Sequence, residues 1–221
     1  RYQNSLVGKA YARYMHWGNR FLSKRMPTLT VGSELFALYE GDAKNISWIS
    51  PSLITEADIR ITRESIGEKY NRSRGKMRLL FVGRVEPEKG LTYLFEALRV
   101  LNKYSEIVWE LIIVGGAQRG SEDKEAEIKD KAEEMGLNRF IDWKGYVPYG
   151  EELKEIYRKS DIFILPSLAE GIPKVLYEAL AFGVPIVSTD VGGISDIIQH
   201  SENGILITPG VAEEIVSAFT L

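Results

Sequence analysis

The sequence predicts an α/β protein built on a doubly wound, Rossmann-like parallel sheet, and three observations lead to this fold class. Between residues 77 and 210, short apolar runs alternate with stretches of helical periodicity. The apolar runs are hydrophobic at nearly every position, which is typical of strands covered on both faces. Each run is followed by a helical stretch that can cross back over the sheet, and such crossovers give parallel strands.

The expected strands are the six apolar runs Arg78–Val82, Glu110–Val114, Phe140–Trp143, Asp161–Leu165, Pro185–Ser188 and Gly204–Ile207. The helices expected between them are Leu91–Asn102, Asp123–Met135, Tyr149–Lys159, Pro173–Phe182 and Ile194–Gln199. In the fourth helix, Pro173 suits the first helical position and Gly183 ends the helix. Ligands of open parallel sheets bind beyond the carboxyl ends of the strands, so a site is expected among the residues that follow each strand.

Composition limits the functional classes. The 221 residues are enough for one large domain or for one domain with part of another. A net charge of −3 implies no general attraction to nucleic acid, and no apolar run approaches the ~20 residues that span a bilayer. The chain has no cysteine, which excludes disulfides and thiolate metal sites. The amino terminus lacks a signal-peptide pattern, so we expect a cytoplasmic location.

Two glutamates eight positions apart, Glu170 and Glu178, flank the expected turn between a strand and a helix. Glu170 is expected at the carboxyl edge of the sheet, and Glu178 lies roughly 7.5 Å along the axis of the helix that follows. The first amides of a helix lack partners and favour an anion. A second anion would be repelled by Glu178, so the expected ligand carries hydroxyl groups beside a phosphate, as a ribose or a hexose does.

Candidate ligand-binding residues follow each of the first three expected strands. Gly83, Arg84 and Lys89 come after the first strand, and the two cationic groups together could neutralise a diphosphate. Gly115 follows the second strand, where a glycine lets the backbone approach a ligand closely. Tyr146 follows the third strand, and its ring is either a ligand contact or part of the packing. No cluster of His, Asp and Glu has the spacing of a metal site, so we expect no metal and no other cofactor.

Two segments resemble the retaining glycosyltransferases of the GT-B superfamily, in particular the family 4-like enzymes also called glycosyl transferases group 1. The run that begins at Glu170, EGIPKVLYEALAFGVPIVSTDVGGISDII, is similar to the donor-sugar motif of that family. The segment from Phe81 to Gly90 is similar to the family's G-R and K-G element. The resemblance implies the carboxyl-terminal half of a GT-B fold with a remnant of the amino-terminal domain.

The activity that the resemblance implies is transfer of a hexose-type sugar from a nucleotide-diphosphate donor, with retention of the anomeric configuration. UDP, GDP and ADP donors all stay open, and so does the acceptor, which could be a glycan or a lipid-linked glycan. Two other classes remain as alternatives: a nucleotide-sugar binding module without turnover, and a sugar-nucleotide epimerase of the same architecture. The sequence does not indicate an oligomeric state.

The resemblance also implies roles for single residues. Glu170 is expected to bond hydroxyls of the transferred sugar and Glu178 those of the ribose, while Arg84 and Lys89 hold the leaving diphosphate. Arg84, Lys89 and Glu170 are therefore the expected catalytic residues. The remaining donor contacts are expected from Gly83, Gly115, Tyr146, Gly171, Ile172, Lys174, Val175 and Glu178, in part through backbone amides. Pro173 has no N–H to contribute.

The domain organisation follows from the same resemblance. Residues 1–56 are expected to be the tail of the amino-terminal, acceptor-side domain, residues 57–76 a linker, and residues 77–221 the donor-binding domain. Such a chain has only a small part of the acceptor-side domain. We therefore expect it to bind nucleotide diphosphates weakly and to transfer little sugar alone.

The first residues show a basic amphipathic pattern, because Leu6, Ala10, Tyr14, Trp17 and Phe21 recur at helical spacing among lysines and arginines. We expect this face to pack in the core of the amino-terminal domain. The alternative is peripheral contact with the inner membrane surface, whose anionic lipids attract basic helices that carry aromatic residues.

Overall fold

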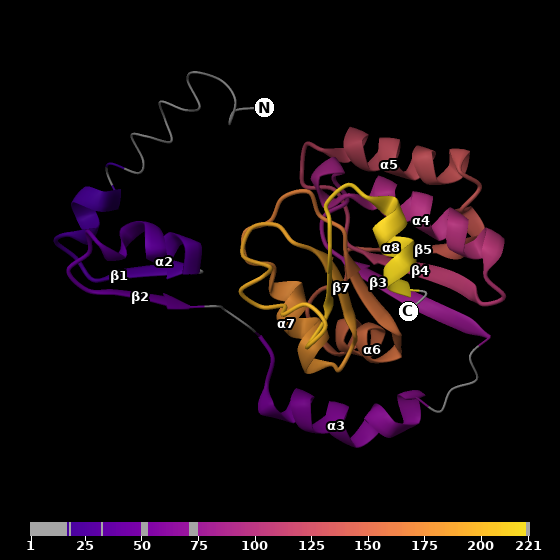
Figure 1. The fold of residues 1–221 in the computed structure, drawn as a ribbon, viewed down its shortest axis with the longest axis horizontal. Coiled ribbons are helices and arrows are strands. Elements are labelled where there is room, and N and C mark those ends of the chain that lie inside the picture. Colours follow the sequence, from indigo (N-terminus) through magenta and orange to yellow (C-terminus); the bar gives the residue numbers. More distant parts are fainter. Residues whose placement is uncertain (1–16, 18, 32, 50–52, 71–74, 220–221) are drawn as a thin grey trace. The chain divides into compact units, whose positions relative to one another are not determined.

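The computed structural model describes residues 17, 19–31, 33–49, 53–70 and 75–219, and the chain forms two compact units, Arg1–Pro51 and Ser52–Leu221 (Figure 1). In the first unit, strand β1 (Thr28–Val31) and strand β2 (Ile46–Ile49) pair in parallel, and helix α2 (Ser33–Glu40) connects them. Two parallel strands need such a crossover, because a tight turn can join only antiparallel neighbours.

The amphipathic pattern near the amino terminus is only partly described. Leu6, Ala10 and Tyr14 lie outside the described residues. Trp17 and residues 19–23 are helical, and the rings of Trp17 and Phe21 stack with their centroids 5.9 Å apart. The guanidinium of Arg25 lies 3.8 Å from the centroid of the Phe21 ring. The packing and membrane interpretations of this face both stay predictions.

The second unit contains a parallel sheet of six strands in its described part, in the order β5-β4-β3-β6-β7-β8. The strands are β3 (Lys76–Val82), β4 (Val108–Val114), β5 (Ile141–Gly145), β6 (Ile162–Leu165), β7 (Ile186–Thr189) and β8 (Ile205–Ile207). All six predicted strands are found within two residues of the expected bounds. The chain moves outward from β3 to β5 and then crosses back to β6, so the order reverses between β3 and β6. The predicted α/β fold class is confirmed.

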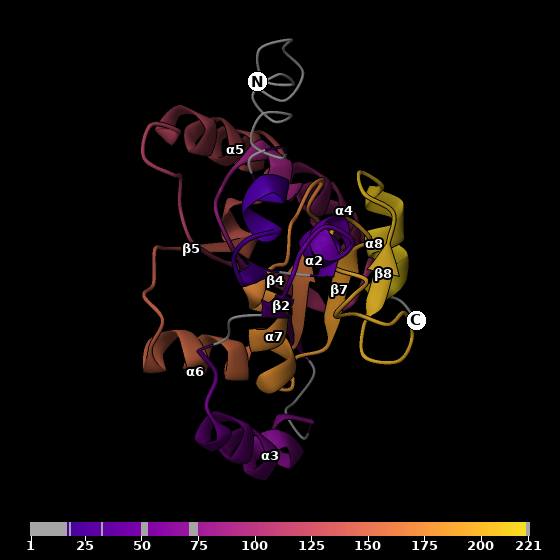
Figure 2. The same ribbon diagram turned by 90° about the vertical axis from the view of Figure 1, so that its left-hand side faces the viewer.

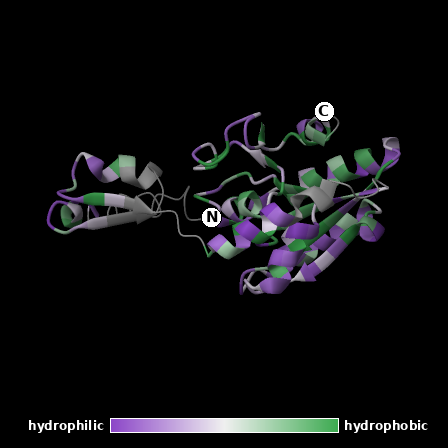
Figure 3. Cartoon of the chain, turned by 90° about the horizontal axis from the view of Figure 1, so that it is seen from below, coloured by the Kyte–Doolittle hydropathy of each residue, from purple (hydrophilic) through white to green (hydrophobic). Residues whose placement is uncertain are grey.

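Helices cover both faces of this sheet (Figures 1 and 2). Helices α4 (Leu91–Tyr104), α5 (Glu122–Glu134) and α8 (Ala212–Phe219) lie on one face, and α4 contacts both α5 and α8. Helices α6 (Glu151–Lys159) and α7 (Lys174–Ala181) lie on the other face, where α6 packs on β3 and α7 on β7. Two single turns of 3-10 helix, Pro87–Lys89 and Asn138–Phe140, lie within the connecting loops. The helices alternate between hydrophilic and hydrophobic colours along their turns, as amphipathic helices do (Figure 3).

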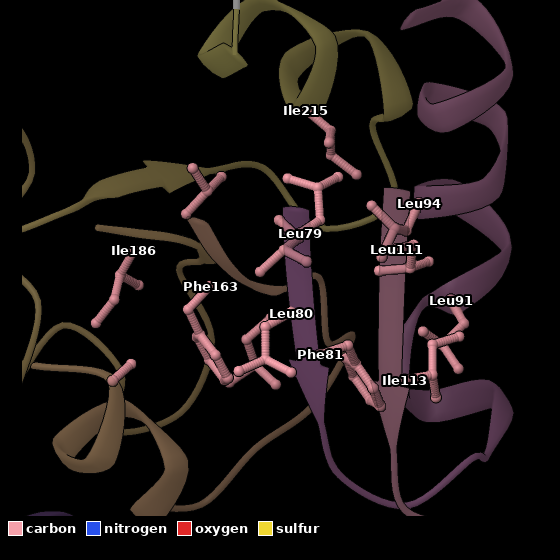
Figure 4. Packing of buried hydrophobic residues seen from close by; sticks show 14 of the residues in the cluster. Leu79, Leu80, Phe81, Leu91, Leu94, Leu111, Ile113, Phe163, Ile186 and Ile215 are labelled. Atoms are coloured by element: carbon pink, nitrogen blue, oxygen red, sulfur yellow. The ribbon is translucent and has the colours of Figure 1, made fainter. Parts of the chain in front are cut away.

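The core explains why these runs form strands rather than loops. On one face, Leu79 of β3 pairs with Leu111 of β4, and Leu94 of α4 lies beside Leu111 (Figure 4). On the opposite face, Leu80 of β3 pairs with Phe163 of β6. All five side chains are fully buried, with exposed fractions of 0%. Since alternate strand residues point to opposite faces and both faces are covered, a run that is apolar throughout is stabilised as a buried strand.

The predicted helix over 194–199 is wrong. The chain there forms only one turn, in which the amides of Ile197 and Ile198 bond to the carbonyl of Ile194. Asn203 prevents its continuation, because its side-chain oxygen accepts from the amide of Gln199 and its amide nitrogen donates to the carbonyl of Ile197. An asparagine that captures backbone groups in this way competes with a helix.

The sequence predicts Pro173 as the first helical residue, but the helix begins one residue later. It takes the position just before α7, with an extended backbone (φ −76°, ψ 114°), and Lys174 is the first helical residue. A proline ring is compatible with either position because neither needs its missing N–H. The prediction that Gly183 ends this helix is confirmed, since Gly183 has a φ of +59° and donates to the carbonyl of Leu180.

Residues 57–76, assigned to a linker from sequence, contain most of helix α3 (Glu56–Tyr70). Thr55 caps this helix, because its hydroxyl and amide both donate to Asp58, at 2.8 Å and 3.0 Å. Asp58 also accepts from Lys154 of α6 at 2.7 Å, and α3 packs against α7. The helix is thus attached to the second unit, whose boundary lies at Ser52.

Candidate functional site

The carboxyl ends of β3, β4 and β5 lie side by side and are joined through their glycines. The amide of Gly83 donates to the carbonyl of Val114 at 2.9 Å, and the amide of Gly115 donates to the carbonyl of Gly145 at 2.7 Å. Gly115 has a φ of +126°, and a Cβ atom at this position would lie 1.9 Å from the carbonyl oxygen of Gly83. A glycine is therefore required here because the two loops approach too closely for any side chain.

The loop after β3 docks onto the loop after β6, which brings Lys89 to the centre of this edge. The amide of Leu168 donates to the carbonyl of Glu88 at 2.8 Å. Gly90 has a φ of +69°, and a Cβ atom there would lie 1.9 Å from the carbonyl oxygen of Pro166. The close contact fixes the residue just before Gly90, which is Lys89.

Lys89 and Glu170 form an ion pair, with 2.6 Å between the ammonium nitrogen and Oε1 of the carboxylate. The same Oε1 accepts a hydrogen bond from the Ser167 hydroxyl, also at 2.6 Å. The side chains of Lys89 and Glu170 are only 13% and 9% exposed. Two residues that are 81 positions apart in the sequence and were predicted to act on one ligand are thus in direct contact.

Arg84 lies in the loop after β3 and is held by two acceptors. Its NH1 atom is 3.0 Å from Oε2 of Glu86 and 2.7 Å from Oε1 of Gln118, which follows β4. Glu86 is buried, whereas the Arg84 side chain is 53% exposed. The guanidinium is therefore fixed in place yet remains open to solvent on the side away from its partners.

Glu178 lies on α7 and is partly buried. Its Oε2 accepts a hydrogen bond of 2.8 Å from the hydroxyl of Tyr157, which comes from α6. Burial raises the pKa of the Glu178 carboxyl, while the Tyr157 hydrogen bond and the charge of Lys174 act in the opposite direction. Burial also raises the pKa of the Tyr157 phenol well above its usual value, so this group stays a donor.

The start of α7 faces the same edge of the sheet. Leu176 donates to the carbonyl of Pro173, while the amides of Lys174 and Val175 have no acceptor among the described residues. The turn at Gly192 and Gly193 forms a wall beside Glu170, because the amide of Gly193 donates to the carbonyl of Gly171 at 2.9 Å. These two free amides are in the position that the sequence predicts for amides contacting a ligand.

The remaining predicted contacts are spread along the same edge. Gly83, Gly115, Gly171 and Ile172 lie in loops that follow strands, and the side chain of Tyr146 after β5 is 82% exposed. Their contacts with a ligand stay predictions. Among the described residues, no three His, Asp or Glu side chains gather in a way that could hold a metal ion, and metal independence likewise stays a prediction.

Sequence reasoning did not select four side chains that hold the predicted ones: Ser167, Tyr157, Glu86 and Gln118. Two of these had a local signal. Ser167 precedes Glu170 by three residues in the same turn, and Glu86 follows Arg84 by two. Tyr157 and Gln118 had none, since their partners are 21 and 34 positions away in the sequence.

Two cavities in the second unit lie away from this edge of the sheet. One, of about 560 Å³, lies between α6 and the β4 and β5 strands and is lined in part by Arg78, Ile112 and Ile156. The other, of about 590 Å³, lies among α4, α5 and α8. Neither includes any of the predicted site residues, and the side chains lining the first carry charges of both signs. The clustered, buried polar contacts at the carboxyl edge therefore remain the better candidate site.

A family model for glycosyl transferases group 1 matches residues 62–221, which is more than half of the chain. The chain belongs to this family. The match covers every strand of the six-stranded sheet and all the predicted site residues.

Among curated proteins, the chain is 34% identical over 132 residues to an uncharacterized glycosyltransferase of Methanocaldococcus jannaschii, covering 59% of this chain and 32% of that protein. It is also 34% identical to the amylovoran biosynthesis glycosyltransferase AmsK of Erwinia amylovora, covering 72% of this chain and 40% of that protein. The chain thus spans less than half the length of these two relatives.

Among solved structures, the chain resembles HepE of Anabaena, crystallised in complex with UDP-glucose, with a TM-score of 0.72 and 21% identity. The match covers 96% of this chain and 58% of HepE. The TM-score supports the fold, which is a Rossmann-like half of a GT-B glycosyltransferase.

No helix in the described part of the chain has both the length and the apolar character needed to cross a membrane.

Proposed function

We propose that the protein is a retaining glycosyltransferase of the family 4-like type, and that residues 77–221 form the carboxyl-terminal domain that binds a nucleotide-diphosphate hexose. The observation that carries this proposal is the Lys89–Glu170 ion pair at the carboxyl edge of the sheet. It joins the β3 loop to the turn before α7 in a chain that belongs to the glycosyl transferases group 1 family. The acceptor, a glycan or a lipid-linked glycan, binds to parts outside this site.

The roles in this proposal are those that the family resemblance implies, and the charges and positions of the residues support them. Arg84 and Lys89 bind the diphosphate and stabilise the negative charge that grows on it as the glycosidic bond breaks. Glu170 accepts hydrogen bonds from hydroxyls of the transferred sugar, and Glu178 accepts from the ribose. In the free chain Lys89 is bound by Glu170 and Arg84 by Glu86, so the arriving diphosphate shares these cations with the carboxylates.

The reaction in this proposal needs no metal ion, because the two cations and the amides of Lys174 and Val175 supply the positive charge. A cytoplasmic protein with peripheral contact at the inner membrane surface is part of the same proposal. A binding module without turnover and an epimerase are not favoured, because the relatives named above are glycosyltransferases.

A thermal-shift series with UDP, GDP and ADP tests the donor site first. A ligand at 100 times its dissociation constant adds about 2.7 kcal/mol to the free energy of unfolding. We expect one diphosphate to raise the Tm clearly, and UDP is the first to try because the HepE structure contains UDP-glucose. Glu178→Ala should remove most of this shift, and an unchanged shift would show that the ribose assignment is wrong.

Turnover is tested separately by incubating the 221-residue chain and a protein of the relatives' full length with a labelled UDP-sugar. We expect transfer by the longer protein and little or none by the chain alone, since the chain spans less than half the length of the two relatives named above. Transfer by the chain alone at the rate of the longer protein contradicts the assignment of acceptor binding to another part. Epimerised donor as the product contradicts transfer altogether.

A further inference from the structure

Tyr157 is a completely buried tyrosine whose hydroxyl points to the candidate ribose site. It lies on α6 with an exposed fraction of 0%, and its hydroxyl donates to Oε2 of Glu178 at 2.8 Å. A buried phenol needs a partner for its hydroxyl, because a donor left unpaired in the interior loses its hydrogen bonds to water without replacement. Glu178 supplies that partner.

The ring of Tyr157 packs against two other aromatic rings. It stacks on Phe163 of β6 with centroids 5.9 Å apart and on Phe182, just after α7, with centroids 5.4 Å apart. Both neighbours are themselves buried, with exposed fractions of 0% and 1%. A ring packed in this way has little rotational freedom, so its hydroxyl occupies one fixed position relative to α7.

This fixed donor leaves the carboxylate of Glu178 with one oxygen occupied and the other open. No hydrogen bond or ion pair to Oε1 of Glu178 is formed by the described residues. An ionised carboxylate can accept several hydrogen bonds, and an ordered one loses less entropy when a ligand binds. The hydrogen bond from Tyr157 also favours the ionised form, against the burial that raises the pKa of Glu178.

We propose that Tyr157 is a positioning residue that holds one oxygen of Glu178 and leaves the other to accept from ribose hydroxyls, so that the site selects ribonucleoside diphosphates. This inference rests on the proposed function of Glu178. A carboxylate that is held ionised discriminates against a sugar without hydroxyl donors, because it then stays buried without its partner. Tyr157 acts on the ligand only through Glu178.

The test compares the affinities of the full chain for UDP and for 2′,3′-dideoxy-UDP by calorimetric titration. The natural chain should bind UDP roughly 10-fold or more tightly than the dideoxy compound, as expected for hydrogen bonds to a charged group. Tyr157→Phe keeps the ring and removes only the hydroxyl. It should weaken UDP binding roughly 5- to 10-fold and leave the affinity for dideoxy-UDP within about 2-fold.

Two further variants complete the design. Tyr177→Phe removes a tyrosine hydroxyl from α7 outside the site and should change neither affinity. Glu178→Gln should remove the preference for UDP over dideoxy-UDP, and adding Tyr157→Phe to it should change that preference little, because coupled residues are not additive.

Each outcome decides the matter. If Tyr157→Phe weakens both ligands equally, or neither, Tyr157 is only a core residue and the inference is overturned while Glu178 keeps its role. If Glu178→Gln leaves the preference for UDP unchanged, the ribose assignment in the proposed function fails and the role of Tyr157 fails with it. Selective loss of UDP affinity in Tyr157→Phe, absent from Tyr177→Phe, supports the inference.

Discussion

The ion pair between Lys89 and Glu170 shows how a single contact can prepare a site. Both side chains are largely buried, and Ser167 adds a second donor to the same carboxylate oxygen. Charges removed from water in this way must be paired, and removing one partner leaves the other uncompensated. The pair therefore keeps two groups of opposite charge ready at one point of the sheet edge, where each can exchange its partner for part of a ligand.

Lys89→Met tests this pair. We expect a loss of stability of about 3 kcal/mol, because the Glu170 carboxylate stays buried without its cation. We also expect UDP affinity to fall at least 10-fold, which corresponds to about 1.4 kcal/mol. Lys159→Met is the matched control, since Lys159 is 56% exposed and pairs with Glu155 on the helix surface. Equal effects of the two substitutions on UDP affinity would contradict a special role for Lys89.

Among the elements, the loops and helix ends decide where the functional groups lie. Gly90 allows the β3 loop to touch the carbonyl of Pro166, and Gly115 allows the β4 loop to touch that of Gly83. Helix α3 is attached through Asp58 in its first turn, because Asp58 accepts from both the capping residue Thr55 and Lys154 of α6. Each contact is between elements that the sequence separates widely, so each depends on the packing of the whole unit.

Gly90→Ala should disturb the site by moving the β3 loop. The new Cβ atom would clash with the Pro166 carbonyl. The alanine would also have to adopt the positive φ of Gly90, which alone costs roughly 1 to 2 kcal/mol. Gly136→Ala is the control, because Gly136 has nearly the same φ, +71°, and a Cβ atom there would have no neighbour within 4 Å among the described residues. We expect weaker UDP binding and a larger drop in Tm for Gly90→Ala only. Similar Tm values and affinities for both variants would show that the loop contact is unimportant.

Asp58→Asn tests the attachment of α3. Burial alone raises the pKa of Asp58, but hydrogen bonds from Lys154 and Thr55 outweigh it and hold the pKa below its usual value of 3.8. A carboxyl with a lowered pKa in the folded state contributes stability above its unfolded pKa and loses it as the pH falls through the folded pKa. The substitution should therefore cost about 3 kcal/mol near pH 7 and progressively less below about pH 4.

The measurement for Asp58→Asn is urea unfolding across that pH range. Glu134→Gln is the control, since Glu134 is 68% exposed in its pair with Lys131 and should change stability by less than about 1 kcal/mol. A loss for Asp58→Asn that does not shrink with falling pH would contradict the ion-pair explanation.

At the scale of the whole molecule, the large hydrophobic cluster of the described residues lies entirely in the second unit. This cluster runs from Leu79 to Ile215 and includes side chains from both faces of the sheet. The capping residue Thr55 and helix α3 belong to the same unit. A unit that holds its own core and its own site is expected to fold by itself.

A shorter chain of residues 53–221 tests this independence. It retains the Thr55–Asp58 cap and the Asp58–Lys154 pair, and we expect it to unfold in one cooperative transition. Its affinity for UDP should match that of the 221-residue chain within about 2-fold, because every predicted donor contact lies within it. Circular dichroism melting and calorimetric titration measure the two properties. A broad, non-cooperative melt would show that the first unit is needed.

Periodicity predicted the strands and most helices of the second unit because burial on two faces leaves a clear local pattern. The same reasoning failed at Ile194–Gln199, where the side chain of Asn203 captures the backbone groups that a longer helix would use. It predicted no helix for Glu56–Tyr70, where charged residues interrupt the apolar pattern. Local pattern is thus reliable where burial dominates and unreliable where single hydrogen bonds decide the conformation.

The candidate site divides in the same way. Glu170 and Glu178, the cations Arg84 and Lys89 and the glycines after the strands could be read along the chain, because strand ends and the helix start mark the functional edge of a parallel sheet. Their pairing could not, since Lys89 meets Glu170, and Tyr157 meets Glu178, only when distant segments pack. Local residue type sets which polar groups are available at this edge of the sheet, whereas packing at van der Waals distance sets which oxygen each group holds and which it leaves open.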